Sequence, residues 1–159
     1  MLEFQAPFSN GMSASLVIGQ KDFTSSNTAV SQSGLPSPTG VAFDPAGNLW
    51  VTGGDVANRL LEFQPPFRTG MEASLVIGQP DFTTGHASIT PNGLSDAKRP
   101  GFDSSGNLWV PDLFNGRVLE FTSTPVPEFP TASLAIVALA SLAVVAMVSR
   151  RFSVTRLGR

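Results

Sequence analysis

The chain has 159 residues, with twelve acidic and ten basic side chains and a formal net charge of −2. Four of the basic residues lie after position 149, so residues 1–149 hold six basic against twelve acidic side chains, a net charge of −6. This acidic body argues against nucleic acid as a partner, because phosphate binding requires clustered Lys and Arg. The chain has no cysteine, which excludes disulfides and thiolate metal sites.

An internal repeat spans most of the body. Residues 2–8 recur as 61–67, a shift of 59 positions (61 − 2), and the same shift relates further segments. These are 14–20 with 73–79, 22–24 with 81–83, and 47–51 with 106–110. Residues 59–63 match 117–121 at a shift of 58, so one residue is lost in the loop before them. A repeat this long indicates a fold built from stacked, equivalent units.

Each unit predicts four short β-strands. In the complete unit we expect strands at 41–44, 48–52, 59–64 and 74–77. Asp44 and Gly47 predict a tight turn between the first two, because Asp accepts backbone hydrogen bonds and Gly adopts positive φ. Residues 60, 62 and 64 alternate with Leu61 and Phe63, the period of two that is typical of a strand. The chain opens on a counterpart of the third strand, at 2–5, and the repeats end on a second set of the first three strands.

These units resemble NHL repeats. The matching residues are 38–44, 47–51 and 58–63 in the first unit, and 102–103, 106–110, 112, 115 and 117–121 in the second. The units depart from the pattern at 52–54 and at 98–101. The resemblance covers roughly residues 1–121 and implies propeller blades, which host unrelated activities. The predicted fold class is therefore all-β, a partial (open) β-propeller of NHL-like four-stranded blades, plus one C-terminal transmembrane α-helix.

About two blades are present in 1–121, whereas a closed propeller typically has four to eight. Two explanations stay open: the chain is the C-terminal part of a longer propeller, or several copies assemble a ring. Truncation at the N-terminus is favoured, because Met1 directly precedes a strand from the middle of a blade.

The C-terminal part predicts a membrane anchor. A Pro-rich stalk at 122–130 precedes an uncharged apolar segment at 131–148, which as a helix spans about 27 Å of a hydrocarbon core of ~30 Å. Arg150 and Arg151 open a basic tail at 149–159. By the positive-inside rule the tail is cytoplasmic and the repeats are extracellular, in a single-pass protein of the cell membrane whose partner is the lipid bilayer. Residues 1–4 lack a secretory leader, which agrees with truncation.

The segment Pro127-Glu128-Phe129, followed by the apolar span and the arginine pair, resembles archaeal PEF-type C-terminal sorting signals. The resemblance implies that these three residues form the sorting motif, recognised by an archaeosortase-like processing enzyme. Pro130 departs from the glycine of some relatives, and a permanent anchor is the alternative.

The candidates for chemistry are few. His86 is the only histidine. A lyase or lactonase site needs several converging ligands, so we expect His86 to be a solvated loop residue. Asp44 and Asp103 are candidate calcium ligands, but a turn role explains both. Asp22, Asp81, Glu62 and Glu120 recur once per unit, which indicates structure first. We therefore predict no catalytic residue, no metal ligand and no cofactor.

The loops at 24–38 and 83–100 are the predicted binding regions, because they are long, polar and rich in Ser, Thr, Asn and Gly. The expected function is a membrane-anchored, surface-exposed repeat protein that binds proteins or glycans or serves structurally in the envelope, not an enzyme. The alternative is the C-terminal fragment of an extracytoplasmic enzyme of lyase or lactonase type, with its active site in missing blades.

Overall fold

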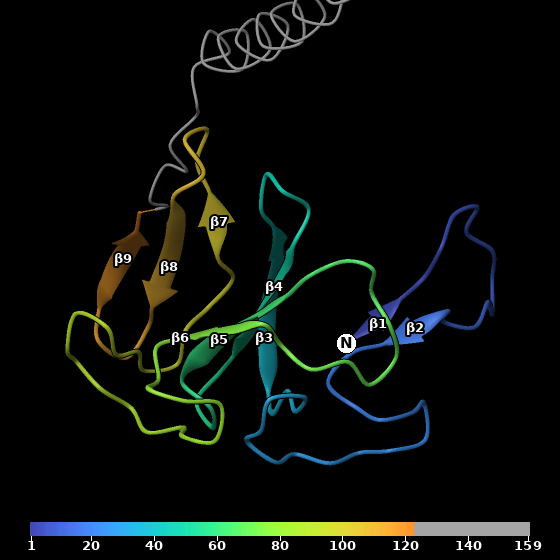
Figure 1. Ribbon diagram of the computed structural model, residues 1–159, viewed down its shortest axis with the longest axis horizontal. Coiled ribbons are helices and arrows are strands. Elements are labelled where there is room, and N and C mark those ends of the chain that lie inside the picture. The colour runs from blue at the N-terminus through green and yellow to red at the C-terminus, as the bar shows by residue number, and fades with distance from the viewer. Residues whose placement is uncertain (123–159) are drawn as a thin grey trace, which may run out of the picture. The chain divides into compact units, whose positions relative to one another are not determined.

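The computed structural model describes residues 1–122, which form nine strands in three antiparallel sheets (Figure 1). The first sheet pairs β1 (Leu2–Glu3) with β2 (Leu16–Val17). The second, in the order β3-β4-β5-β6, contains β3 (Pro38–Phe43), β4 (Leu49–Gly53), β5 (Arg59–Phe63) and β6 (Leu75–Ile77). The third, in the order β7-β8-β9, contains β7 (Gly101–Phe102), β8 (Leu108–Asp112) and β9 (Arg117–Phe121).

The strands expected from the repeat are confirmed at their positions, within a few residues at their ends. The register of the central sheet aligns Val41 with Val51, Val51 with Leu61, and Leu61 with Val76. Successive side chains of a strand point to opposite faces, so these four side chains lie in one row on one face. The third sheet repeats this pattern, with Val110 paired to Leu119.

Two separate cores lie on the two faces of the central sheet. Toward β1 and β2, the buried residues are Ile18, Leu35, Leu49, Val51, Leu61, Phe63 and Ala73. Toward β7–β9, they are Trp50, Leu60, Leu94, Ala97, Leu108 and Val110. The members from β4 and β5 alternate between the two cores, so every residue of both strands is buried. Both faces of the β4–β5 pair are therefore interior, although β5 includes a carboxylate, whereas the outer strands β3 and β6 are partly exposed.

That carboxylate, Glu62, is 8% exposed and accepts a hydrogen bond from Ser74 Oγ at 2.6 Å. Close approach of the second and third sheets depends on Gly40, because a Cβ there would lie 2.3 Å from the Cα of Arg99. The small residue of the Pro-Thr-Gly segment thus allows two repeat units to stack.

The predicted fold class is contradicted. The described part is all-β, but it consists of three small sheets of two, four and three strands and contains no helix. Only the middle unit forms a four-stranded sheet. The first sheet contains only the counterparts of its third and fourth strands, and the last sheet contains, within 1–122, only the counterparts of its first three strands. No helix able to cross a membrane is found over these residues.

Several predictions concern residues that lie outside the described range. They are the apolar span at 131–148, the sorting motif Pro127, Glu128 and Phe129, and the flanking Arg150 and Arg151.

The double-sided burial of β4 predicts a contrast between two valines. Val51 is fully buried, whereas Val56, in the turn after β4, is 50% exposed. We expect Val51→Ala to lower the free energy of unfolding by about 2 kcal/mol or more, since about 0.8 kcal/mol is lost per buried CH₂ and a cavity remains. Val56→Ala should change it by less than about 0.5 kcal/mol. Urea unfolding measures both, and equal effects would contradict the buried position of Val51.

Candidate binding site

The two candidate loops have the same internal hydrogen bonds. Asp22 Oδ1 accepts from the backbone N–H of Thr24 and Ser25, at 2.9 and 2.7 Å. Its equivalent 59 positions later, Asp81, accepts from the N–H of Thr83 and Thr84, both at 2.8 Å. Carboxylates that accept such bonds hold a turn at the start of each loop.

A glutamine bridges each loop further along. Gln20 Nε2 donates to the carbonyl of Asn27 at 2.6 Å, and its Oε1 accepts from the N–H of the same residue at 2.9 Å. In the second loop, Gln79 Nε2 donates to the carbonyl of His86 at 2.8 Å. Both loops are therefore ordered by their own polar side chains.

An arginine from the third strand of each unit holds the far end of the loop. Arg59 Nη2 donates to the carbonyls of Ser31 and Gly34, at 2.7 and 3.2 Å, and its Nη1 donates to the carbonyl of Phe82. The equivalent Arg117 Nη2 donates to the carbonyls of Thr90 and Gly93, at 2.8 and 2.9 Å. Loop backbone that has no strand partner gains its hydrogen bonds from these guanidinium groups.

The two arginines differ in their charge partners. Arg117 Nε donates to Asp112 Oδ2 at 2.8 Å. The equivalent of Asp112 in the middle unit is Gly53 (112 − 59), which has no carboxylate. Arg59 accordingly forms no ion pair within the described residues. Burial lowers the pKa of the Arg59 guanidinium, and the charge of Asp81 works against that shift.

The second loop also binds a turn of the preceding unit. Asn58 lies at the end of the turn between β4 and β5, with a positive φ of 47°, and makes three hydrogen bonds to this loop. Its carbonyl accepts from Gln79 Nε2 at 2.9 Å, its Nδ2 donates to the carbonyl of Gly85 at 3.0 Å, and its Oδ1 accepts from the N–H of Asp96 at 2.8 Å. We call the three loop groups the turn socket.

The first loop presents the same three groups without a turn. The equivalents are Gln20, Ser26 and Ser37, each 59 positions earlier. Ser37 shares its positive φ with Asp96, at 47° against 56°, so the backbone has the same local conformation. Within 1–122, no group forms a hydrogen bond with the Ser26 carbonyl or the Ser37 N–H. One N–H of Gln20 Nε2 donates to Asn27, and its second N–H has no acceptor within these residues. Ser26 and Ser37 are exposed, whereas Asp96 is buried.

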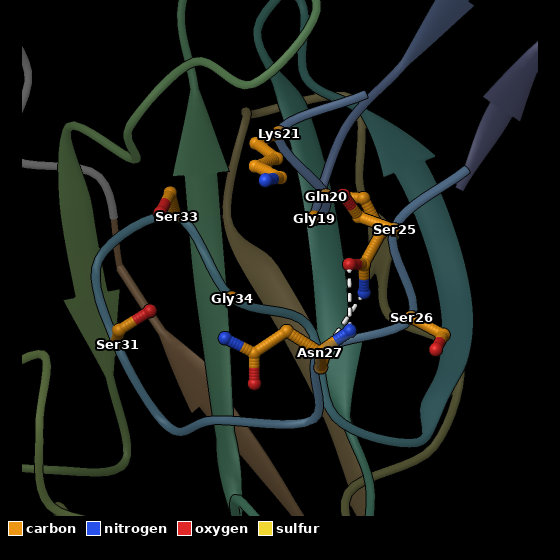
Figure 2. Close-up of a pocket in the computed structure, with 9 residues that line it drawn as sticks. All are labelled: Gly19, Gln20, Lys21, Ser25, Ser26, Asn27, Ser31, Ser33 and Gly34. Atoms are coloured by element: carbon orange, nitrogen blue, oxygen red, sulfur yellow. Dashed lines mark hydrogen bonds between the residues drawn. The ribbon is translucent and has the colours of Figure 1, made fainter. Parts of the chain in front are cut away.

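A cavity of about 550 Å³ adjoins two of these three residues, Gln20 and Ser26 (Figure 2). It is lined by Gly19, Gln20, Lys21, Ser25, Ser26, Asn27, Ser31, Ser33 and Gly34. Figure 2 shows the Asn27 and Ser31 side chains directed toward each other from opposite sides of the loop. Lys21 is the one ionisable side chain of the lining. The site therefore presents mainly uncharged hydrogen-bonding groups, together with the ammonium group of Lys21.

The two candidate calcium ligands accept hydrogen bonds from their own turns. Asp44 Oδ1 accepts from the N–H of Ala46 and Asn48, and its Oδ2 accepts from Trp50 Nε1 at 3.1 Å. Asp103 repeats this arrangement, with Trp109 Nε1 at 3.0 Å. The turn role is therefore confirmed for both. No group of three or more His, Asp or Glu side chains suited to a metal ion occurs over 1–122.

The only histidine, His86, is exposed in the second loop. Glu62 is buried beside Ser74, and Asp22 and Asp81 hold the loop turns described above. Within 1–122 the structure does not bring these side chains together into one site.

Sequence reasoning missed the turn socket. Its only sequence signal is the repetition of Gln20 as Gln79, because the other two socket groups belong to the backbone. No model of a known protein family matches the chain, and no curated protein matches it. The resemblances to NHL repeats and to PEF-type signals therefore stay predictions.

Arg59 predicts a loss of loop order on substitution. Arg59→Lys keeps the charge but cannot reach three carbonyls of two loops, and bonds to charged groups contribute about 1.5–3 kcal/mol each. We expect a loss of about 3 kcal/mol in urea unfolding and faster hydrogen exchange at the amides of Asn27 and Gly34. Arg68→Lys, at an exposed position, is the control and should have no effect. Unchanged exchange in Arg59→Lys would show that the guanidinium does not hold the loop.

The turn aspartates predict a loss of stability in acid. Hydrogen bonds from the Trp109 side chain and the Asn107 backbone lower the pKa of Asp103 to about 2. The pKa values of Asp22 and Asp81 are also lowered to about 2, chiefly by hydrogen bonds from Ser25 and Thr83 respectively. Since the unfolded chain binds these protons near pH 4, the stability contributed by the lowered pKa values is present above about pH 4 and is lost as the pH falls toward 2.

Urea midpoints measured at pH 6, 4 and 2.5 test this. Asp103→Asn removes one titrating group, so its midpoint should depend less on pH than that of the parent chain. Asp55→Asn is the control, because the Asp55 carboxylate accepts no hydrogen bond within 1–122. A parent midpoint that stays constant down to pH 2.5 would contradict the turn roles.

Proposed function

We propose that this chain is a binding module whose first loop takes up a turn of polypeptide backbone. The observation that supports this most is the occupied counterpart: the second loop binds the turn around Asn58 through Gln79, Gly85 and Asp96. The first loop has the same donor, acceptor and donor in its Gln20, Ser26 and Ser37.

The chemistry of the cavity favours binding over catalysis. Its lining offers hydroxyl, amide and backbone groups and the amine of Lys21, and it includes neither a carboxylate nor an imidazole. Activation of a serine nucleophile needs a general base within hydrogen-bond reach, and within 1–122 no hydrogen bond joins Lys21 to a serine of the lining. A polypeptide turn, by contrast, needs only donors and acceptors at fixed positions.

The loop is also preorganised for binding. The Gln20–Asn27 pair fixes one side, and Arg59 fixes the Ser31 and Gly34 carbonyls at the other. A site whose groups are already held loses less conformational entropy when a ligand binds. The loops predicted as binding regions thus contain an arrangement suited to that role.

A cyclic peptide tests the proposal. We would titrate the ¹⁵N-labelled chain with cyclised Gly-Asp-Val-Ala-Asn-Arg, the sequence of residues 54–59. Three hydrogen bonds of about 1 kcal/mol each, with some apolar contact, correspond to a dissociation constant of about 1 mM. The amide signals of Gln20, Ser26 and Ser37 should shift.

The repeat offers a matched pair of variants. Ser33→Trp fills the first-loop cavity and should weaken peptide binding at least about tenfold, a loss of about 1.4 kcal/mol. Asn92→Trp places the same side chain at the equivalent position of the second loop (33 + 59) and should leave binding unchanged. Shifts confined to other residues, or the same shifts produced by oligosaccharides and not by the peptide, would overturn the proposal in favour of no site or of a glycan site.

A further inference from the structure

The residue that occupies the second loop is an asparagine whose side chain is fully hydrogen-bonded. Asn58 is 4% exposed. Its Oδ1 accepts from the N–H of Asp96 at 2.8 Å, and its Nδ2 donates to the carbonyls of Asp55 and Gly85, at 2.9 and 3.0 Å. A carboxamide has one oxygen and two N–H groups, so each of these groups has a partner. The second loop therefore binds both polar ends of this side chain.

The backbone of the same residue adds a second requirement. Asn58 has a positive φ of 47°, in the left-handed region that most side chains avoid. Glycine, asparagine and aspartate adopt this conformation at the lowest cost. Among the asparagines of residues 1–122, only Asn58 has a positive φ. The bound residue thus combines a carboxamide with a tolerance of positive φ.

The first loop contains the two groups that bind such a carboxamide. The Ser26 carbonyl is the equivalent of the Gly85 carbonyl. The Ser37 N–H is the equivalent of the Asp96 N–H, and φ is positive at both residues. Ser37 is held in place on its other side, because its carbonyl accepts from the N–H of Gly54 at 2.9 Å. One acceptor and one donor are therefore available at equivalent positions.

We propose that the first loop is specific for a turn that carries asparagine at its residue of positive φ. The inference rests on the proposed function, since it names the class of polypeptide turn that the loop takes up. The carboxamide of that asparagine donates to the Ser26 carbonyl and accepts from the Ser37 N–H. The main-chain carbonyl of the same residue accepts from Gln20. These three bonds repeat those of Asn58 in the second loop.

Other side chains lack part of this set. Aspartate tolerates positive φ but has no N–H at neutral pH, so a carboxylate oxygen would lie against the Ser26 carbonyl. Glutamine has its carboxamide one methylene further from the backbone, and glycine has none. A site that hydrogen-bonds a ligand group rejects analogues that lack the group, because its own polar groups then stay unpaired.

The two loops differ at one point beside these groups. Ser26 has a side chain, whereas its equivalent in the second loop is Gly85. A Cβ added at Gly85 would lie 3.0 Å from the carbonyl oxygen of Val56, which is a tight contact. A turn in the first loop must therefore shift slightly at that carbonyl. Because the Val56 carbonyl accepts no hydrogen bond within 1–122, the shift breaks no bond of the turn.

A series of cyclic peptides tests the specificity. The parent is the cyclised sequence of residues 54–59, and its variants carry Asn58→Gly, Asn58→Gln or Asn58→Asp. The amide signals of Ser26 and Ser37 in the ¹⁵N-labelled full-length chain give the dissociation constants. We expect the Gly and Gln peptides to bind at least about tenfold more weakly than the parent, because the carboxamide bonds are lost. The Asp peptide should bind more weakly than the Gly peptide.

Two controls locate the effect. The Val56→Thr peptide should bind like the parent, because Val56 is 50% exposed in the occupied turn and its side chain does not enter the set of bonds. In the Ser33→Trp chain, where the first-loop cavity is filled, the differences among the peptides should disappear.

The occupied second loop gives an independent check in the chain itself. Asn58→Gly keeps the positive φ and should lower the urea midpoint, because the carboxamide bonds are lost. Asn58→Asp should lower it further at pH 7, since an oxygen replaces the N–H groups that donate to Asp55 and Gly85. The reverse order would show that this loop does not bind the carboxamide, and would overturn the inference drawn for the first loop.

The peptide outcomes separate the specificity from the proposed function. If the Asn, Gly and Asp peptides bind equally and all shift Gln20, Ser26 and Ser37, the proposed function stands and the specificity is wrong. Binding of the Gln or Asp peptide as tight as that of the parent would also overturn the specificity. If no peptide shifts these signals, the parent included, both proposals fail.

Discussion

Two strands of the central sheet, β4 and β5, are buried on both faces, and the neighbouring sheets are arranged around this requirement. A four-stranded sheet of this size, alone in water, would expose two apolar faces, and isolated small sheets have little independent stability. Here the first sheet covers one face through Ile18 and its neighbours, and the third sheet covers the other through Leu108 and Val110. Stability in such a stack comes from contacts between neighbouring units as well as from each unit.

The loops are the second consequence of stacking. Each connection between units must run along the side of two sheets without forming a strand, so its backbone carbonyls need donors from elsewhere. Arg59 and Arg117 supply them, and within 1–122 every buried side-chain nitrogen and oxygen has a hydrogen-bond partner. Each arginine therefore connects its strand to the loop that precedes its own unit. Arg59 also connects its strand to the next loop, through the carbonyl of Phe82.

The sequence was sufficient for features that depend on local chemistry and on repetition. The strands and the turns at Asp44 and Asp103 follow from the residues within each segment. The repeat supports these predictions, because the same segments occur twice in the sequence. Burial and binding groups depend on which unit packs beside a segment, so they do not follow from the sequence of the segment itself. Identical Leu-Glu-Phe segments are buried at Leu61 and exposed at Leu2, and the binding groups of the socket are mostly backbone. The helix predicted from the apolar run lies at 131–148, outside the described residues, and the fold of 1–122 contains only strands.

The third sheet differs from the central sheet in how the turn before its β9 strand is held. The turn around Asn58 is tied to the next loop, through Gly85 and Asp96. The turn before β9 is tied to its own unit instead, because Asn115 Nδ2 donates both to Asp112 Oδ2 and to the carbonyl of Ser88. Asp112 is fully buried and also binds Arg117 and the N–H of Ser95. One buried carboxylate thus holds the turn, the strand that follows it and the loop before the third sheet together, a role that Gly53 at the equivalent position of the central sheet cannot take.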